Sequence, residues 1–195
     1  MVKLNLEIDE EVREFNIPEN WDEVTIEQFI NLFSFERQGM TELNIATRTI
    51  NVFTGIDEDL LLMMNYNDFQ QIIGVLQFTN KDMEPQVVDY VELDGEKYYL
   101  RKDFDKFTMG EIISIETILS SSENNILKVM DKLLCIFLRK KKENGKFEPF
   151  KGEMMDRVEL FRTAPVSKIH HIFNFFLDGG TLSTSNMKDF LENQK

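Results

Sequence analysis

The sequence predicts an α+β fold, mainly α, built as two pseudo-repeated lobes, each a β-hairpin followed by about three helices. Three observations lead to this prediction. Apolar residues alternate with polar ones in two hairpin-like segments, a threonine-based capping box follows each segment, and the same order of elements occurs twice along the chain. With 42% hydrophobic and 29% charged residues among 195, the composition is typical of a folded protein rather than a disordered one.

The first lobe is expected over residues 1–80. Apolar and polar side chains alternate over residues 4–8 and 12–17, on either side of a polar turn, which predicts a β-hairpin. Thr25, followed three residues later by Gln28, matches a capping box, so a helix is expected to begin there. Further helices are expected near residues 43–54 and 67–78, with a short helical turn within residues 57–64.

The second lobe is expected over residues 88–182, after a polar linker at 81–87. Asp94-Gly95 lies between two β-rich runs, which is a strong signal for a tight hairpin turn. A second capping box is then predicted from the sequence at Thr108 and Glu111, and helices follow. The remaining expected segments are a helix through Ile126–Phe137, a basic insertion at 139–156, an apolar helix through Val166–Phe176 and a C-terminal tail at 183–195.

The internal repeat depends on constant spacing between corresponding residues. Trp21 and Thr25 match Phe104 and Thr108, each 83 residues later (104 − 21 = 83), and the offset is 84 in the second helices. In the third helices it is 97, so 13 residues (97 − 84 = 13) are inserted in the second copy. These matches favour two similar lobes. Two unrelated amphipathic segments can also align by periodicity, and this alternative stays open.

The net charge of −13 is unevenly distributed along the chain. Residues 1–84 contain 5 basic and 17 acidic groups, or −12, whereas the remainder contains 17 basic and 18 acidic groups, or −1. An acidic chain is a poor match for the phosphates of nucleic acid or the anionic surface of a membrane, so we expect neither as a partner. The asymmetry favours ordered association with copies of itself or with a charged protein.

Residues able to support catalysis or bind metal are few. Cys135 is the single cysteine and lies in an apolar run, where it is expected to be a small core residue. His170 and His171 are adjacent, so on a helix they point about 100° apart and cannot both face one ligand. The acidic run Asp57–Asp59 precedes a helical turn and is typical of N-terminal capping. We therefore expect no enzyme activity, no cofactor and no metal.

No secretory signal or membrane span is recognised in the sequence. The N-terminal residues lack an apolar run after a basic segment, and the longest apolar stretches, such as residues 133–138, fall far short of the roughly 20 residues that cross a bilayer. A soluble protein made in a reducing cytoplasm is expected.

Two groups of residues are the candidates for binding a partner. One is the basic run that opens the insertion. The other is a pair of adjacent phenylalanines in the expected last helix, which must point in different directions. Either one of them contacts another subunit, or both belong to the core under the other lobe, and both alternatives stay open. The candidate partner-binding residues are Arg139, Lys140, Lys141, Lys142, Phe175 and Phe176.

Several segments together resemble small proteins of tailed bacteriophages that are encoded among head–tail and tail genes. The resemblance covers most of residues 15–178 and consists of spacing patterns rather than invariant chemistry. The segments are IPENWDEVTIEQFINL (17–32), TGIDEDLLLMMNYNDFQQIIGVLQF (54–78), FTMGEIISIETIL (107–119) and VELFRTAPVSKIHHIFNFF (158–176).

The resemblance implies a non-enzymatic morphogenesis protein, a structural subunit of the virion head–tail or tail region made in the host cytoplasm. Its implied partners are other phage head–tail or tail proteins and, as a homo-oligomer, further copies of itself. The alternative within the family is a tail assembly chaperone that is absent from the mature virion. Two other classes stay open: a small enzyme using His170, Cys135 and a carboxylate, and a regulator that binds a host protein.

Overall fold

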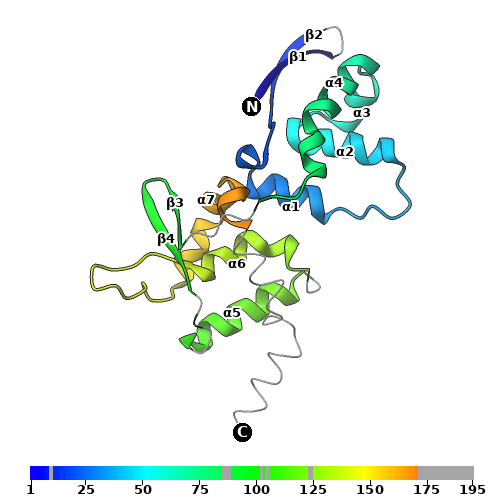
Figure 1. Cartoon of the computed structure of the whole chain (residues 1–195). Coiled ribbons are helices and arrows are strands. Elements are labelled where there is room, and N and C mark those ends of the chain that lie inside the picture. Colours follow the sequence, from blue (N-terminus) through cyan, green and yellow to red (C-terminus); the bar gives the residue numbers. More distant parts are fainter. Residues whose placement is uncertain (9–10, 85–88, 102, 104–105, 123–124, 171–195) are drawn as a thin grey trace.

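The computed structural model describes residues 1–8, 11–84, 89–101, 103, 106–122 and 125–170. Over these residues the fold is α+β and mainly α, as the sequence predicts. Two small antiparallel sheets lie at different ends of a group of short helices (Figure 1). The internal repeat of the two lobes stays a prediction, and below we write of an N-terminal half (residues 1–84) and a C-terminal half (residues 89–170).

The N-terminal half begins with a hairpin whose strands pair antiparallel from Val2↔Ile17 to Ile8↔Glu11. Helices of one to four turns follow it and pack beside one another (Figure 1). The elements are β1 (Val2–Ile8), β2 (Glu11–Ile17), η1 (Trp21–Glu23), α1 (Ile26–Ser34), α2 (Glu42–Thr54), α3 (Glu58–Leu62), α4 (Tyr66–Leu76) and η2 (Gln77–Asn80), where η marks a 3-10 helix.

The C-terminal half also begins with a hairpin, and a third strand extends its sheet in the order β3-β4-β5. The third strand comes directly after a helix and was not predicted from the sequence. The elements are β3 (Tyr90–Leu93), β4 (Glu96–Leu100), α5 (Met109–Ser120), η4 (Leu127–Val129), α6 (Met130–Phe137), β5 (Leu138–Arg139), η5 (Gly152–Arg157), α7 (Val158–Arg162) and η6 (Val166–Lys168).

Both predicted capping boxes are formed. The Thr25 hydroxyl accepts a hydrogen bond from the Gln28 backbone N–H at the start of α1, while the Gln28 side chain accepts one from the Thr25 N–H. Thr108 and Glu111 repeat this arrangement at the start of α5. Each box satisfies backbone donors that have no partner inside the helix, so the sequence fixes both helix starts.

Local turn chemistry also follows the sequence. Asp94 and Gly95 both have positive φ, at 49° and 74°, which a two-residue type I′ hairpin turn requires and which most side chains resist. The side chain of Asp57 accepts a hydrogen bond from the Asp59 N–H and caps α3, so the acidic run is a helix cap as expected.

The two halves share one hydrophobic core rather than forming separate bodies. A continuous cluster of buried side chains extends from Leu6 to Ile169, and α1 contacts α6 and α7 of the other half. Backbone hydrogen bonds also join the halves, from the Ile26 N–H to the Ala164 carbonyl at 3.0 Å and from the Val166 N–H to the Val24 carbonyl at 2.8 Å. The entry to α1 is therefore held directly against the C-terminal half.

The linker and the last helix differ in part from expectation. Residues 81–84 of the expected linker are described, and there Met83 packs on the core while the Lys81 carbonyl accepts a hydrogen bond from Trp21. After Pro165 the chain forms a short 3-10 turn at Val166–Lys168, in place of the first turn of the expected α-helix. The rest of that helix and the expected tail at 183–195 lie outside the described residues.

Candidate interaction surfaces

The basic run at 139–142 is divided among different environments because it leaves a helix, enters a strand and then a turn. Arg139 belongs to β5 and is 0% exposed, so it offers no surface to a partner. Its Nε donates to the Ile136 carbonyl at 2.9 Å and its Nη2 donates to Glu111 Oε1 at 2.6 Å. The prediction that Arg139 faces a partner therefore has no support in the fold, which uses this side chain internally.

Glu111 is the centre of a buried ionic cluster. Its carboxylate, 1% exposed, accepts hydrogen bonds from Arg101 and Arg139 while it also completes the capping box of α5. Burial lowers the pKa of Arg139, and the negative charge of Glu111 opposes that shift. The cluster joins α5 to β5 and to Arg101, the residue that follows β4. Glu111 and Arg139 are buried and Arg101 is nearly so, so these charges stabilise the fold.

The lysine hairpin, defined here as residues 140–147, follows β5 and projects beside the β3–β4 hairpin (Figure 1). Lys141 and Phe147 form an antiparallel bridge, and the Lys142 N–H donates to the Lys146 carbonyl at 2.8 Å. The turn closes at Gly145, whose φ of 74° suits glycine. The basic insertion is therefore an ordered structure at this point.

The base of the lysine hairpin is fastened by Glu148. Its carboxylate receives two hydrogen bonds from the Arg157 guanidinium, at 2.5 and 2.9 Å, and one from the Lys140 N–H at 2.9 Å. Burial acts to raise the pKa of Glu148, but these hydrogen bonds outweigh it and the pKa lies below its usual range. This anchoring fixes the direction in which the hairpin projects.

The lysines of the hairpin differ in whether their ammonium groups already have a partner. Lys140 forms an ion pair with Glu96 at 3.3 Å, and the Lys141 ammonium lies 4.2 Å from the centre of the Tyr99 ring. Lys142 and Lys146, on either side of the turn, are exposed and form no ion pair with any residue that the structure describes. The available positive charge is thus at the tip. Phe175 and Phe176, the other predicted partner-binding residues, lie outside the described residues.

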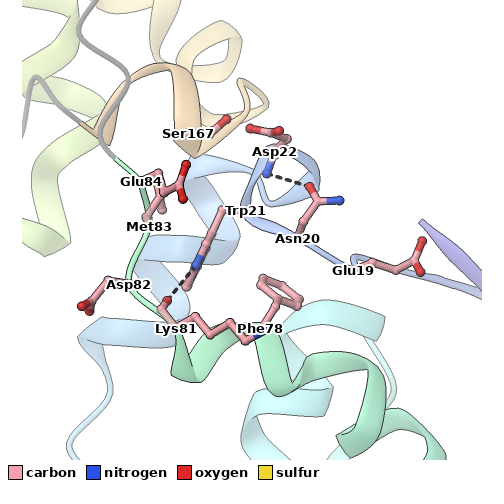
Figure 2. Close-up of a pocket in the computed structure, with 10 residues that line it drawn as sticks. All are labelled: Glu19, Asn20, Trp21, Asp22, Phe78, Lys81, Asp82, Met83, Glu84 and Ser167. Atoms are coloured by element: carbon pink, nitrogen blue, oxygen red, sulfur yellow. Dashed lines mark hydrogen bonds between the residues drawn. The ribbon is translucent and has the colours of Figure 1, made fainter.

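The acidic cleft, a surface not predicted from the sequence, is lined mainly by the N-terminal half, with Ser167 contributed by the C-terminal half. It is an open cavity of about 370 Å³ between η1, the segment after α4 and η6. Figure 2 shows its ten lining residues, which come from three parts of the chain far apart in sequence. They are Glu19, Asn20, Trp21, Asp22, Phe78, Lys81, Asp82, Met83, Glu84 and Ser167.

Trp21 forms the apolar floor of the acidic cleft and is held from several sides. Its ring centre lies 5.3 Å from that of Phe78 in an edge-to-face contact and 6.0 Å from that of Phe29. Its Nε1 donates to the Lys81 carbonyl at 3.1 Å (Figure 2). These contacts fix the indole in place, so the cleft has a defined shape.

Four carboxylates are among the residues that line the cleft: Glu19, Asp22, Asp82 and Glu84. Glu19 lies 3.5 Å from the N-terminal ammonium of Met1, which partly neutralises it. Asp22, Asp82 and Glu84 are exposed and have no ion-pair partner in the part of the chain that the structure describes. Lys81 is the single lysine or arginine in the lining. The cleft therefore combines an apolar floor with an excess of negative charge at its edge.

Neither Cys135 nor His170 lines the acidic cleft. Burial raises the pKa of the Cys135 thiol to about 12, so it stays protonated at neutral pH. His170 packs its ring against Phe29, and burial lowers the pKa of His170; its Nδ1 has no hydrogen-bond partner among the described residues. Cys135 is a core residue as expected, and His171 lies outside the described residues.

The described residues form neither a metal-ligand cluster nor a membrane-spanning helix. No group of three or more histidine, cysteine or acidic side chains is placed to hold a metal ion within the described ranges. Among the helices described, none has both the length and the apolar character needed to cross a bilayer.

The structure is an α+β fold with two exposed charged surfaces, the acidic cleft and the lysine hairpin. Comparisons of the chain with protein families, with curated proteins and with solved structures found no match.

Proposed function

We propose that this chain is a non-enzymatic bacteriophage morphogenesis protein, a structural subunit of the virion head–tail or tail region that acts through protein–protein contacts. The resemblance of residues 15–178 to small phage proteins supports this proposal. The structure adds one further observation: buried charged groups are paired, whereas the charges of the acidic cleft and of the tip of the lysine hairpin are exposed.

That observation carries the proposal. Charged groups inside the fold are paired with one another, as in the Glu111 cluster and in the Asp131–Arg162 pair at 2.7 Å. In contrast, the unpaired charges of the acidic cleft and the lysine hairpin are exposed, and those of the hairpin are on paired backbone. Exposed charges of opposite sign on two surfaces favour a particular partner and a particular orientation in protein assembly.

The direct test is mass spectrometry of purified phage particles from a host infected with the phage that encodes this chain. The proposal expects the chain at a fixed copy number relative to the tail proteins, retained after washing at high salt. Abundance in the infected-cell lysate with absence from particles would overturn the structural role and indicate the tail assembly chaperone instead. A matched purification from cells expressing the chain without the phage controls for adherent protein.

A further inference from the structure

We propose that the lysine hairpin of one copy docks in the acidic cleft of a second copy. This inference deepens the proposed function and rests on it in one respect, because it names a partner for a protein that acts through protein contacts. The partner is the chain itself, and the contact joins two different surfaces.

The acidic cleft suits a lysine side chain in both of its parts. A lysine has an apolar stem and a charged end, and it is well placed where the stem lies on apolar surface and the ammonium reaches carboxylates. Trp21, Phe78 and Met83 supply the apolar surface. Asp82 and Glu84 supply carboxylates at the edge, and the indole face adds attraction for a cation.

The lysine hairpin supplies side chains of this kind in a fixed arrangement. Lys142 and Lys146 are joined across the turn by the backbone hydrogen bond of 2.8 Å, so their positions are coupled. Because the strand pairing and the Glu148–Arg157 contact already order the hairpin, docking costs little conformational entropy. Lys142 and Lys146 are opposite in charge to the three cleft carboxylates that have no ion-pair partner among the described residues, so the two surfaces attract each other.

A second copy is favoured over other occupants by the chain's own charge distribution. Glu148 holds the base of the lysine hairpin, so the hairpin is not free to fold onto the acidic cleft of its own chain. Lys142 and Lys146 form no ion pair among the residues that the structure describes. Nucleic acid is disfavoured because Tyr99 and Phe147 already lie against Lys141 and leave no free ring for base stacking on this hairpin. The acidic half, at −12, would also repel phosphates.

The test is charge reversal with complementation between two variants, followed by light scattering after size-exclusion chromatography. The cleft variant carries Asp82→Lys and Glu84→Lys, and the hairpin variant carries Lys142→Glu and Lys146→Glu. All four side chains are exposed and have no ion pair among the described residues, so circular dichroism should show unchanged folding. Each variant alone sets like charges against each other at the contact, and we expect at least a tenfold weaker self-association.

An equimolar mixture of the two variants provides the decisive result. The reversed hairpin then meets the reversed cleft, while the unchanged hairpin meets the unchanged cleft, so both contacts regain opposite charges. The mixture is expected to recover the mass of the wild-type assembly. A matched control, Glu36→Lys with Glu116→Lys, makes the same charge change as the cleft variant at exposed positions away from the cleft, and it should associate like the wild type.

Three results would overturn this inference: a wild-type chain that is monomeric at low salt, variants that associate like the wild type, or a mixture that recovers no assembly. The outcome is separable from that of the proposed function. A monomeric chain found at fixed copy number in particles removes the inference and leaves the function. A self-associating chain that is absent from particles removes the proposed function and leaves the inference.

Discussion

Buried charged residues of the C-terminal half and exposed charged residues of the N-terminal half are used in opposite ways. In the C-terminal half, Glu111 and Arg139 are buried and hold helix α5 to the sheet. In the N-terminal half, Asp82 and Glu84 are exposed beside an apolar floor and have no ion-pair partner among the described residues. The comparison shows that burial, and not residue type, decides the use of a charged side chain. Buried charges stabilise the fold, and exposed charges are available for a contact.

Neighbours within the basic run give the largest expected contrast. Arg139→Ala leaves the Glu111 carboxylate buried with one of its two guanidinium partners gone, and it should lower the free energy of unfolding by about 3–5 kcal/mol. Lys142→Ala, three residues further on, should change it by less than about 0.5 kcal/mol because the side chain is exposed. Urea denaturation measures both, and equal losses would refute the division of this run into a buried and an exposed part.

The two capping boxes allow a second comparison at corresponding positions. Glu111→Gln keeps an oxygen for the cap but removes the charge that binds Arg101 and Arg139, so a loss of about 1.5–3 kcal/mol is expected. Gln28→Ala removes only a cap contact on α1, for about 0.3–1.5 kcal/mol. Thermal unfolding of both variants provides the measurement. If Gln28→Ala cost more, the ionic cluster would not be the main function of Glu111.

The base of the lysine hairpin should respond to pH. Because the pKa of Glu148 is lowered in the folded state, its contacts contribute full stability above its unfolded pKa of about 4.3 and lose it as the pH falls toward the folded value. The expected contribution is on the order of 1 kcal/mol. Comparing acid unfolding of the wild type with Glu148→Gln isolates it, since the variant should show a shallower decline below pH about 5. Parallel curves would contradict the assignment.

The smallest expected effect concerns Cys135. Since burial holds the thiol protonated, with a pKa of about 12, the folded chain should react with a thiol reagent at neutral pH only as fast as it unfolds. Mass spectrometry after timed alkylation, with a sample in denaturant as the control, provides the measurement. Rapid labelling of the native chain would place this cysteine at the surface and reopen a chemical role for it.

Much of the local structure is predictable because short-range chemistry determines it. Thr25 and Thr108 mark helix starts, and Asp94-Gly95 marks a turn, since each satisfies a backbone requirement within a few residues. The burial of Arg139 is less evident, because four consecutive basic residues look alike in sequence. The one available signal is that Arg139 directly ends the apolar run 133–138.

The acidic cleft could not be predicted from the sequence for a different reason. Its lining combines residues 19–22, 78–84 and Ser167, which the shared core brings together across both halves. No pattern within any one of these segments indicates a cavity. The charge asymmetry of the sequence favoured association with copies of the chain or with a charged protein, without indicating which half forms the contact. The fold shows which carboxylates line a cleft with an apolar floor.

The central claim is that the exposed charges of the two halves bind one another between copies. The mass of the purified wild-type chain, measured by sedimentation at about 0.05 M and about 0.5 M salt, tests it most directly, because salt screens exposed charges. We predict a defined assembly of several 23.0 kDa chains at low salt that dissociates at high salt. A single 23.0 kDa species under both conditions would contradict the claim.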